Sequence, residues 1–103
     1  MALTVTVGVA YGSDPERVEA VLVDEARKAA IEVTGLLAEP PPVVRLIPGF
    51  GLYGLDFTLS CQVASFVDQY VVQHELRKRV LRRLRTEGID LPYPIDSERK
   101  ESS

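Results

Sequence analysis

The sequence predicts an α+β fold in the βαββαβ order of ferredoxin-like domains, with a four-stranded antiparallel sheet and two helices on one of its faces. Three observations lead to this prediction. Residues 55–63 alternate between apolar and polar side chains, which is typical of a strand with one buried and one wet face. Residues 18–33 and 72–84 both carry apolar side chains at helical spacing. Shorter apolar runs around these segments supply the other three strands.

The beginning of the chain predicts a strand that leads directly into a helix. Threonine and valine dominate residues 3–10, and both suit a pleated, largely buried strand. A helix is expected over residues 14–34. Ser13, followed three residues later by Glu16, predicts a capping box at its start, and Pro15 lies in the first turn, where it removes no hydrogen bond.

The middle of the chain predicts a hairpin. Gly35 can end the first helix, and three prolines make a stiff approach to a strand at 43–47. The glycine-rich connection at 48–54 suits a turn with positive-φ positions. A phosphate-binding loop would lead into a helix, usually with a lysine, whereas a strand follows here. The side chains expected on the buried face of that strand are Leu55, Phe57, Leu59, Cys61 and Val63.

The last third of the chain predicts a helix at 68–87, a short strand at 89–93 and a polar tail. Right-handed crossovers would place the first and third strands side by side in the centre of the sheet. We therefore expect one domain over residues 1–95 and a disordered tail over residues 96–103.

Length and composition limit the possible classes of protein. A chain of 103 residues is enough for one hydrophobic core. No stretch approaches the roughly 20 apolar residues that cross a bilayer, and the N-terminus lacks the pattern of a signal peptide. The single cysteine cannot form an internal disulfide, which favours a reducing, cytosolic setting.

Four short segments stand out by their order and spacing. They are Gly-Val-Ala-Tyr-Gly-Ser-Asp at 8–14, Pro-Pro-Pro-Val-Val-Arg-Leu at 40–46, Leu-Asp-Phe at 55–57 and Gly-Ile-Asp-Leu-Pro-Tyr-Pro at 88–94. Together they resemble the C-terminal cytoplasmic domain of the small-conductance mechanosensitive channel (MscS) family. The resemblance covers roughly residues 5–94. Residues 95–100 lack the apolar alternation of that family's terminal barrel strand, so the resemblance does not extend to barrel closure.

The resemblance implies a non-catalytic vestibule domain at the cytoplasmic face of the cell membrane. In that family seven copies form a cage with side openings below the pore, and the membrane contact is made by helices that precede this domain. Met1 would then begin an excised part of a longer channel. The candidate contact between copies is the strand margin that ends in Pro92, Tyr93 and Pro94, although the prolines remove hydrogen-bond donors there. We expect the isolated domain to be a monomer or a weak, edge-mediated dimer.

No combination of residues indicates catalysis, a cofactor or a metal. His74 lies in the middle of a helix without a nucleophile motif, and its spacing from Cys61 matches no zinc site. Cys61 is expected to be a small buried hydrophobe. Asp14, Glu16 and Glu19 crowd the start of a helix, where negative charge is favoured by the helix dipole. We therefore expect a protein that is not an enzyme.

A run of six cations near the end of the second predicted helix supports an alternative hypothesis. Its members are Arg77, Lys78, Arg79, Arg82, Arg83 and Arg85. The alternative is a freestanding ferredoxin-like module that binds nucleic acid or a small ligand. Ferredoxin-like domains that bind RNA stack bases on aromatic residues of their central strands. Because Phe57 is expected in the core, we predict no nucleic-acid binding and assign the run to surface and helix-end charge.

Overall fold

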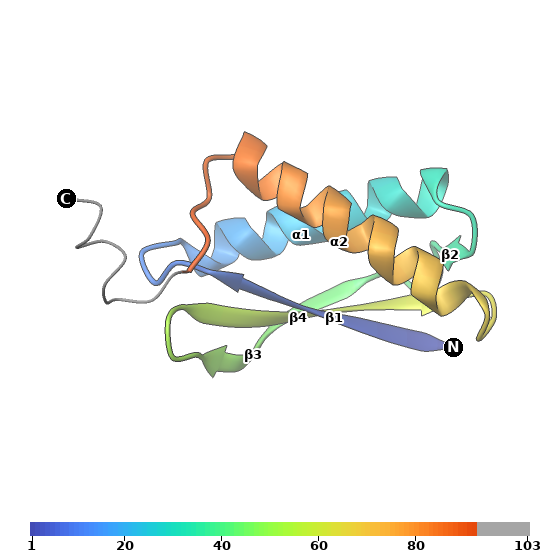
Figure 1. The fold of residues 1–103 in the computed structure, drawn as a ribbon, viewed down its shortest axis with the longest axis horizontal. Coiled ribbons are helices and arrows are strands. Elements are labelled where there is room, and N and C mark those ends of the chain that lie inside the picture. Colours follow the sequence, from blue (N-terminus) through green and yellow to red (C-terminus); the bar gives the residue numbers. More distant parts are fainter. Residues whose placement is uncertain (93–103) are drawn as a thin grey trace.

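The structure is a computed structural model that describes residues 1–92 and consists of a β-sheet with both helices on one face (Figure 1). The elements are β1 (Ala2–Val9), α1 (Pro15–Glu32), β2 (Leu36–Leu37), β3 (Val43–Phe50), β4 (Leu55–Val63) and α2 (Asp68–Thr86). The α+β class, the antiparallel four-stranded sheet and the two helices are as the sequence predicts.

Strand β4 is the centre of the sheet. It pairs along its whole length with β1, from Ala2 opposite Gln62 to Val9 opposite Leu55. On its other side, β4 pairs directly with both β2 and β3. The predicted adjacency of the first strand and the strand at 55–63 is therefore confirmed. The predicted central place of the first strand is wrong for residues 1–92, where β1 lies at the edge of the sheet because no strand forms at 89–92 to cover it.

The alternation in β4 explains how the core forms. Every second residue of this strand is buried beneath the helices, and Phe57 and Leu59 are among the most deeply buried residues of the protein. The helices contribute apolar stripes that pack on this face, with Leu22 from α1 and Leu76 from α2 fully buried. The opposite face carries small polar side chains and has no helix over it (Figure 1).

The predicted strand at 89–93 is the main difference from expectation. Residues 89–92 form no strand. They make one backbone hydrogen bond near β1, in which the amide of Ala10, just after the strand, donates to the Asp90 carbonyl at 2.9 Å. Pro92 instead lies against Gly8 and Gly54, whose missing side chains leave room for its ring. A proline has no N–H to donate, so packing prevails over pairing here. The fourth strand is β2, which pairs with β4 over only two residues.

Part of the predicted C-terminal region lies outside the described residues. This applies to Tyr93 and Pro94 of the candidate interface, to the domain boundary at residue 95 and to the tail at 96–103.

The start of α1 also differs from expectation. Asp14, not Ser13, is the N-cap, and its side chain accepts a hydrogen bond from the Glu16 amide at 3.1 Å. Pro15 follows at the first helical position, and a residue before proline avoids helical backbone angles. Asp14 accordingly has an extended backbone, which is the conformation of an N-cap. The predicted Ser13 capping box is therefore wrong by one residue.

Candidate functional site

Two arginines of the basic run lie in the contact between the helices. Arg83 Nη1 of α2 is 2.8 Å from Asp24 Oδ2 and 3.1 Å from Glu25 Oε1, both on α1. Arg79 Nη1 is 3.3 Å from the other oxygen of Glu25, and Arg79 also pairs with Glu32. Glu25 is buried and bridges the two guanidinium groups. We call these five residues the interhelical ion network.

A second set of contacts ties the ends of the two helices together. Arg83 Nε donates to Glu87 Oε2 at 2.8 Å. Arg17, from the first turns of α1, donates through Nη2 to the Glu87 carbonyl at 2.7 Å and to its carboxylate at 3.1 Å. Arg83 therefore bonds partners both on α1 and at the end of its own helix.

The network shifts the pKa values of several of its members and of the neighbouring Glu87. Hydrogen bonds from Arg83 hold the pKa values of Asp24 and Glu87 below their ordinary range, and a hydrogen bond from Arg79 does the same for Glu32. The pKa of Arg83 is raised, first by Glu87 and then by Asp24. These shifts accompany ion pairing between helices and need no ligand.

The other cations of the run have fewer partners. Lys78 pairs with Glu75 on its own helix at 3.6 Å, and Arg77 Nη1 donates to Gln73 at 2.8 Å. Arg82 and Arg85 are exposed, and no ion pair joins either of them to another residue within 1–92. The expectation of no nucleic-acid binding stays a prediction, but the network already uses part of the charge on which the alternative depended.

The sequence contained a signal for the network that the pattern analysis missed. Glu25 lies on the apolar stripe of α1, since Leu22 precedes it by three residues and Ala29 follows by four. A carboxylate on a core-facing stripe requires a cation beside it, because an unpaired buried charge is costly. The run of cations on α2 was the available source of a partner for Glu25.

Of the three candidate interface residues, the structure describes Pro92, which lies at the end of the sheet where β3 turns into β4. Pro92 is half-buried, and a side-chain carbon at Gly54 would be 2.8 Å from the proline Cβ and 2.2 Å from the carbonyl oxygen of Val9. The turn closes with a hydrogen bond from Gly51 N to Gly54 O at 2.8 Å. Tyr11 donates its hydroxyl to the Gly51 carbonyl. The turn is thus held closely against the end of β1.

The same end of the sheet exposes large apolar side chains that the sequence analysis interpreted only as a turn. Phe50 and Leu52 are each 81% exposed, and Tyr11 and Tyr53 are about half exposed beside them. We call these four residues the hairpin-end patch. Their exposure follows from the turn, whose glycines bring the backbone against β1 and leave the side chains outward.

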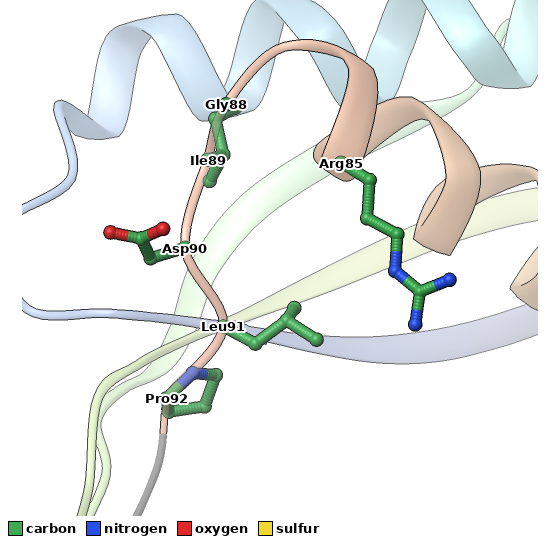
Figure 2. Close-up of a pocket in the computed structure, with 6 residues that line it drawn as sticks. All are labelled: Arg85, Gly88, Ile89, Asp90, Leu91 and Pro92. Atoms are coloured by element: carbon green, nitrogen blue, oxygen red, sulfur yellow. The ribbon is translucent and has the colours of Figure 1, made fainter.

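An open hollow of about 520 Å³ lies on the other side of Pro92 (Figure 2). Figure 2 shows Arg85 reaching from α2 toward β1, with Leu91 beside the strand. Gly88, Ile89 and Asp90 complete its lining. The hollow is shallow and open and contains one cation and one carboxylate, which does not form a catalytic arrangement.

A comparison with models of protein families decides which family these features belong to. Residues 3–91 match the model described as "Mechanosensitive ion channel MscS, C-terminal". The chain belongs to this MscS family. A comparison with curated proteins returned no match. Within residues 1–92, neither helix has the length and apolar character that crossing a membrane requires.

The segments behind the sequence resemblance serve the fold of this MscS domain. Gly8 of the first segment leaves space for Pro92 of the last, and the Ala10 amide donates to Asp90 between the same two segments. Motifs of this kind specify how the chain closes on itself. They do not mark a site of chemistry.

The remaining reactive side chains of the MscS domain occupy ordinary structural positions. His74 is exposed on α2. Cys61 is buried in β4, and burial raises the pKa of its thiol to about 11, which disfavours the reactive thiolate. Asp56 lies partly exposed on the helix-free face of the sheet. Among residues 1–92, no group of three or more histidine, cysteine, aspartate or glutamate side chains could hold a metal ion.

Proposed function

We propose that this domain is a non-catalytic part of the cytoplasmic cage below the pore of a mechanosensitive channel, with seven copies around a vestibule. The observation that carries the proposal is the family match, which spans residues 3–91. The membrane contact and the tension sensor would then belong to other parts of the channel.

The exposed apolar surfaces of the domain support assembly into a ring. The hairpin-end patch lies at the beginning of β4, and a second group of exposed apolar residues follows the end of β4. The second group, which we call the loop-end patch, consists of Phe66, Val67, Tyr70 and Val71. Large apolar groups gathered on a surface commonly mark interfaces. The chain segments that carry most of the two patches, residues 50–53 and 66–71, lie at opposite ends of the sheet (Figure 1).

Two unlike patches suit a ring better than a two-fold dimer. A closed ring with an odd number of copies uses head-to-tail contacts, in which each copy contributes two different surfaces. Phe66 and Tyr70 of the loop-end patch stack edge to face with ring centres 6.4 Å apart, so this surface has a defined shape. The hairpin-end patch of the next copy is the partner that we assign to it.

The polar face of the sheet suits a surface in contact with water and passing solutes. Thr4, Thr6, Thr58 and Ser60 occupy this face, opposite the helices. A ferredoxin-like module for RNA would need aromatic side chains there, and Phe57 is buried on the other side. No observation of the structure favours the alternative hypothesis over the channel.

The test is to reconstitute into liposomes the longest polypeptide that the gene encodes around this domain. We expect apolar spans upstream, seven copies by subunit counting and a conductance that opens with membrane tension. The proposal fails if the gene encodes no membrane spans, or if the reconstituted protein conducts nothing under tension up to bilayer rupture.

A further inference from the structure

Strand β1 has a free edge along the described part of the chain. Met1 and Val63 exchange two backbone hydrogen bonds, of 3.3 and 2.8 Å, so the odd-numbered residues of β1 direct their backbone groups toward β4. The even-numbered residues direct theirs away from it, because these groups alternate along a strand. The bond from Ala10 N to Asp90 O, on the far side, agrees with this alternation.

The backbone groups of Ala2, Thr4 and Thr6 are therefore left open. Their N–H and C=O groups face away from β4, and within residues 1–92 no other strand pairs with β1. Gly8 faces the same way, but Pro92 lies against it. Unpaired edge groups of this kind are a template for another strand.

The free edge of β1 also lacks the features that normally prevent such pairing. Residues Ala2–Val9 contain no proline, no charged side chain and no register shift. The opposite edge of the sheet is different, because β3 contains Arg45 and Pro48 and its register shifts between Arg45 and Gly49. Proteins commonly protect exposed edges by charge, proline or bulges. The edge of β3 is protected in this way and that of β1 is not.

A groove lies beside the free edge, between β1 and α2. Apolar side chains from both elements and from the segment after α2 line it, and its volume is about 170 Å³. These side chains are Val5, Val7, Val80, Leu81, Leu84 and Leu91. Leu91 also lines the hollow of Figure 2, so the two depressions adjoin. An added strand would find open hydrogen-bonding groups and an apolar surface side by side.

The rim of the groove is basic. Arg77 lines the groove and Arg85 lines the adjoining hollow, and both are exposed. Asp90, at the far end of the hollow, is the one carboxylate among the residues that line the two depressions. Eight residues separate the arginines, or about 12 Å along a helix, and four strand residues span about 13 Å. An added strand could therefore present carboxylates to both arginines from positions four residues apart.

We propose that the free edge of β1 binds an extended acidic peptide segment of another polypeptide, which adds to the sheet as a strand. Its backbone pairs with Thr4 and Thr6, one apolar side chain enters the groove, and flanking carboxylates meet Arg77 and Arg85. This binding goes beyond the proposed cage function and does not depend on it. A second copy of β1 is a poorer occupant, because it would bring the same two arginines against each other.

The experiment uses the full chain and the labelled probe acetyl-Thr-Glu-Thr-Val-Thr-Glu-Thr-amide. A matched probe has lysine in place of both glutamates. In low salt we expect the acidic probe to bind about tenfold more tightly by fluorescence anisotropy, with the ratio falling as salt rises. The double variant Arg77→Glu, Arg85→Glu should reverse the preference. Arg82→Glu, on the same helix but outside the groove, should leave it unchanged.

Amide hydrogen exchange locates the binding. In the free protein the amides of Thr4 and Thr6 should exchange faster than those of Val5 and Val7, and the acidic probe should slow them. Equal binding of the two probes, or binding without this protection, would overturn the proposal. So would protection in the free protein that disappears on deletion of residues 93–103, because the chain would then cover its own edge. Protection that grows with protein concentration would assign the edge to a second copy instead.

Discussion

The contact between α1 and α2 is closed by charges, whereas the hairpin end of the sheet exposes apolar side chains. In the helix contact, Arg79 and Arg83 are neutralised by carboxylates of the same chain. At the hairpin end, Phe50 and Leu52 have almost no protein around them. The comparison shows that a charge run in the sequence can be internal to the fold, while an apparent turn can form the surface that is available to a partner.

The largest effect on stability is expected from filling the close contact that positions the hairpin end. Gly54→Val would place a side chain 2.2 Å from the Val9 carbonyl oxygen, so the turn must move away from β1. We expect the free energy of unfolding in urea to fall by about 3 kcal/mol. Gly12→Val is the control, because nothing lies within 4 Å of the position of its side chain. Equal losses from the two variants would show that the close contact is unimportant.

A smaller but clear effect is expected in the helix contact. Glu25→Gln removes the charge that both arginines share, while the other carboxylates of the interhelical ion network remain. We expect a loss of about 2 kcal/mol in thermal or urea unfolding, since a buried ion pair is broken and the two arginines keep only their more exposed partners. Glu19→Gln, in the exposed early part of α1, should change the stability by less than about 0.5 kcal/mol. An unchanged free energy of unfolding in Glu25→Gln would mean that the network does not stabilise the fold.

Lowering the pH should also weaken the contact between α1 and α2, but by less than Glu25→Gln does. The folded-state pKa values of Asp24, Glu32 and Glu87 lie below their ordinary values of 3.8, 4.5 and 4.5. Groups with lowered pKa stabilise the fold above their unfolded pKa, and this stability is lost as the pH falls through the folded value. The free energy of unfolding should therefore fall as the pH drops below about 4.5.

Removing the shared cation provides the check on this pH dependence. Arg83→Gln should flatten the decline, because the hydrogen bonds from Arg83 are the main cause of the shifts at Asp24 and Glu87. Arg82→Gln should leave the decline as it is in the unmodified protein. An unchanged slope in Arg83→Gln would contradict the assignment of these shifts to the network.

Long, periodic elements could be predicted from the sequence. The alternation of β4 identified its buried face residue by residue, since a strand with one wet face has no other stable arrangement. The stripes of α1 and α2 were equally informative, and the pairing of β1 with β4 followed from the handedness of the crossover.

The features that the sequence did not predict depend on contacts between distant residues. Pro92 leaves the edge of β1 because Gly8 and Gly54, far away in the chain, create the space for it. The two-residue strand Leu36–Leu37 is too short to produce a period. Arg83 was recognisable as a cation, but its partner on α1 became apparent only when the helices were placed together. The exposed state of Leu52 likewise depends on how the turn packs.

The most direct test of the account asks whether the hairpin-end patch joins copies of the domain. Leu52→Asn is compared with Ile31→Asn, which changes an equally exposed residue of α1 outside both patches. Each is introduced into the full-length channel, and the fraction of assembled oligomer is measured by native mass spectrometry. In the isolated domain, Leu52→Asn should change the unfolding free energy by less than about 0.5 kcal/mol. We predict that Leu52→Asn lowers the assembled fraction and Ile31→Asn does not. Full assembly of the Leu52→Asn channel, or equal losses from the two variants, would contradict the account.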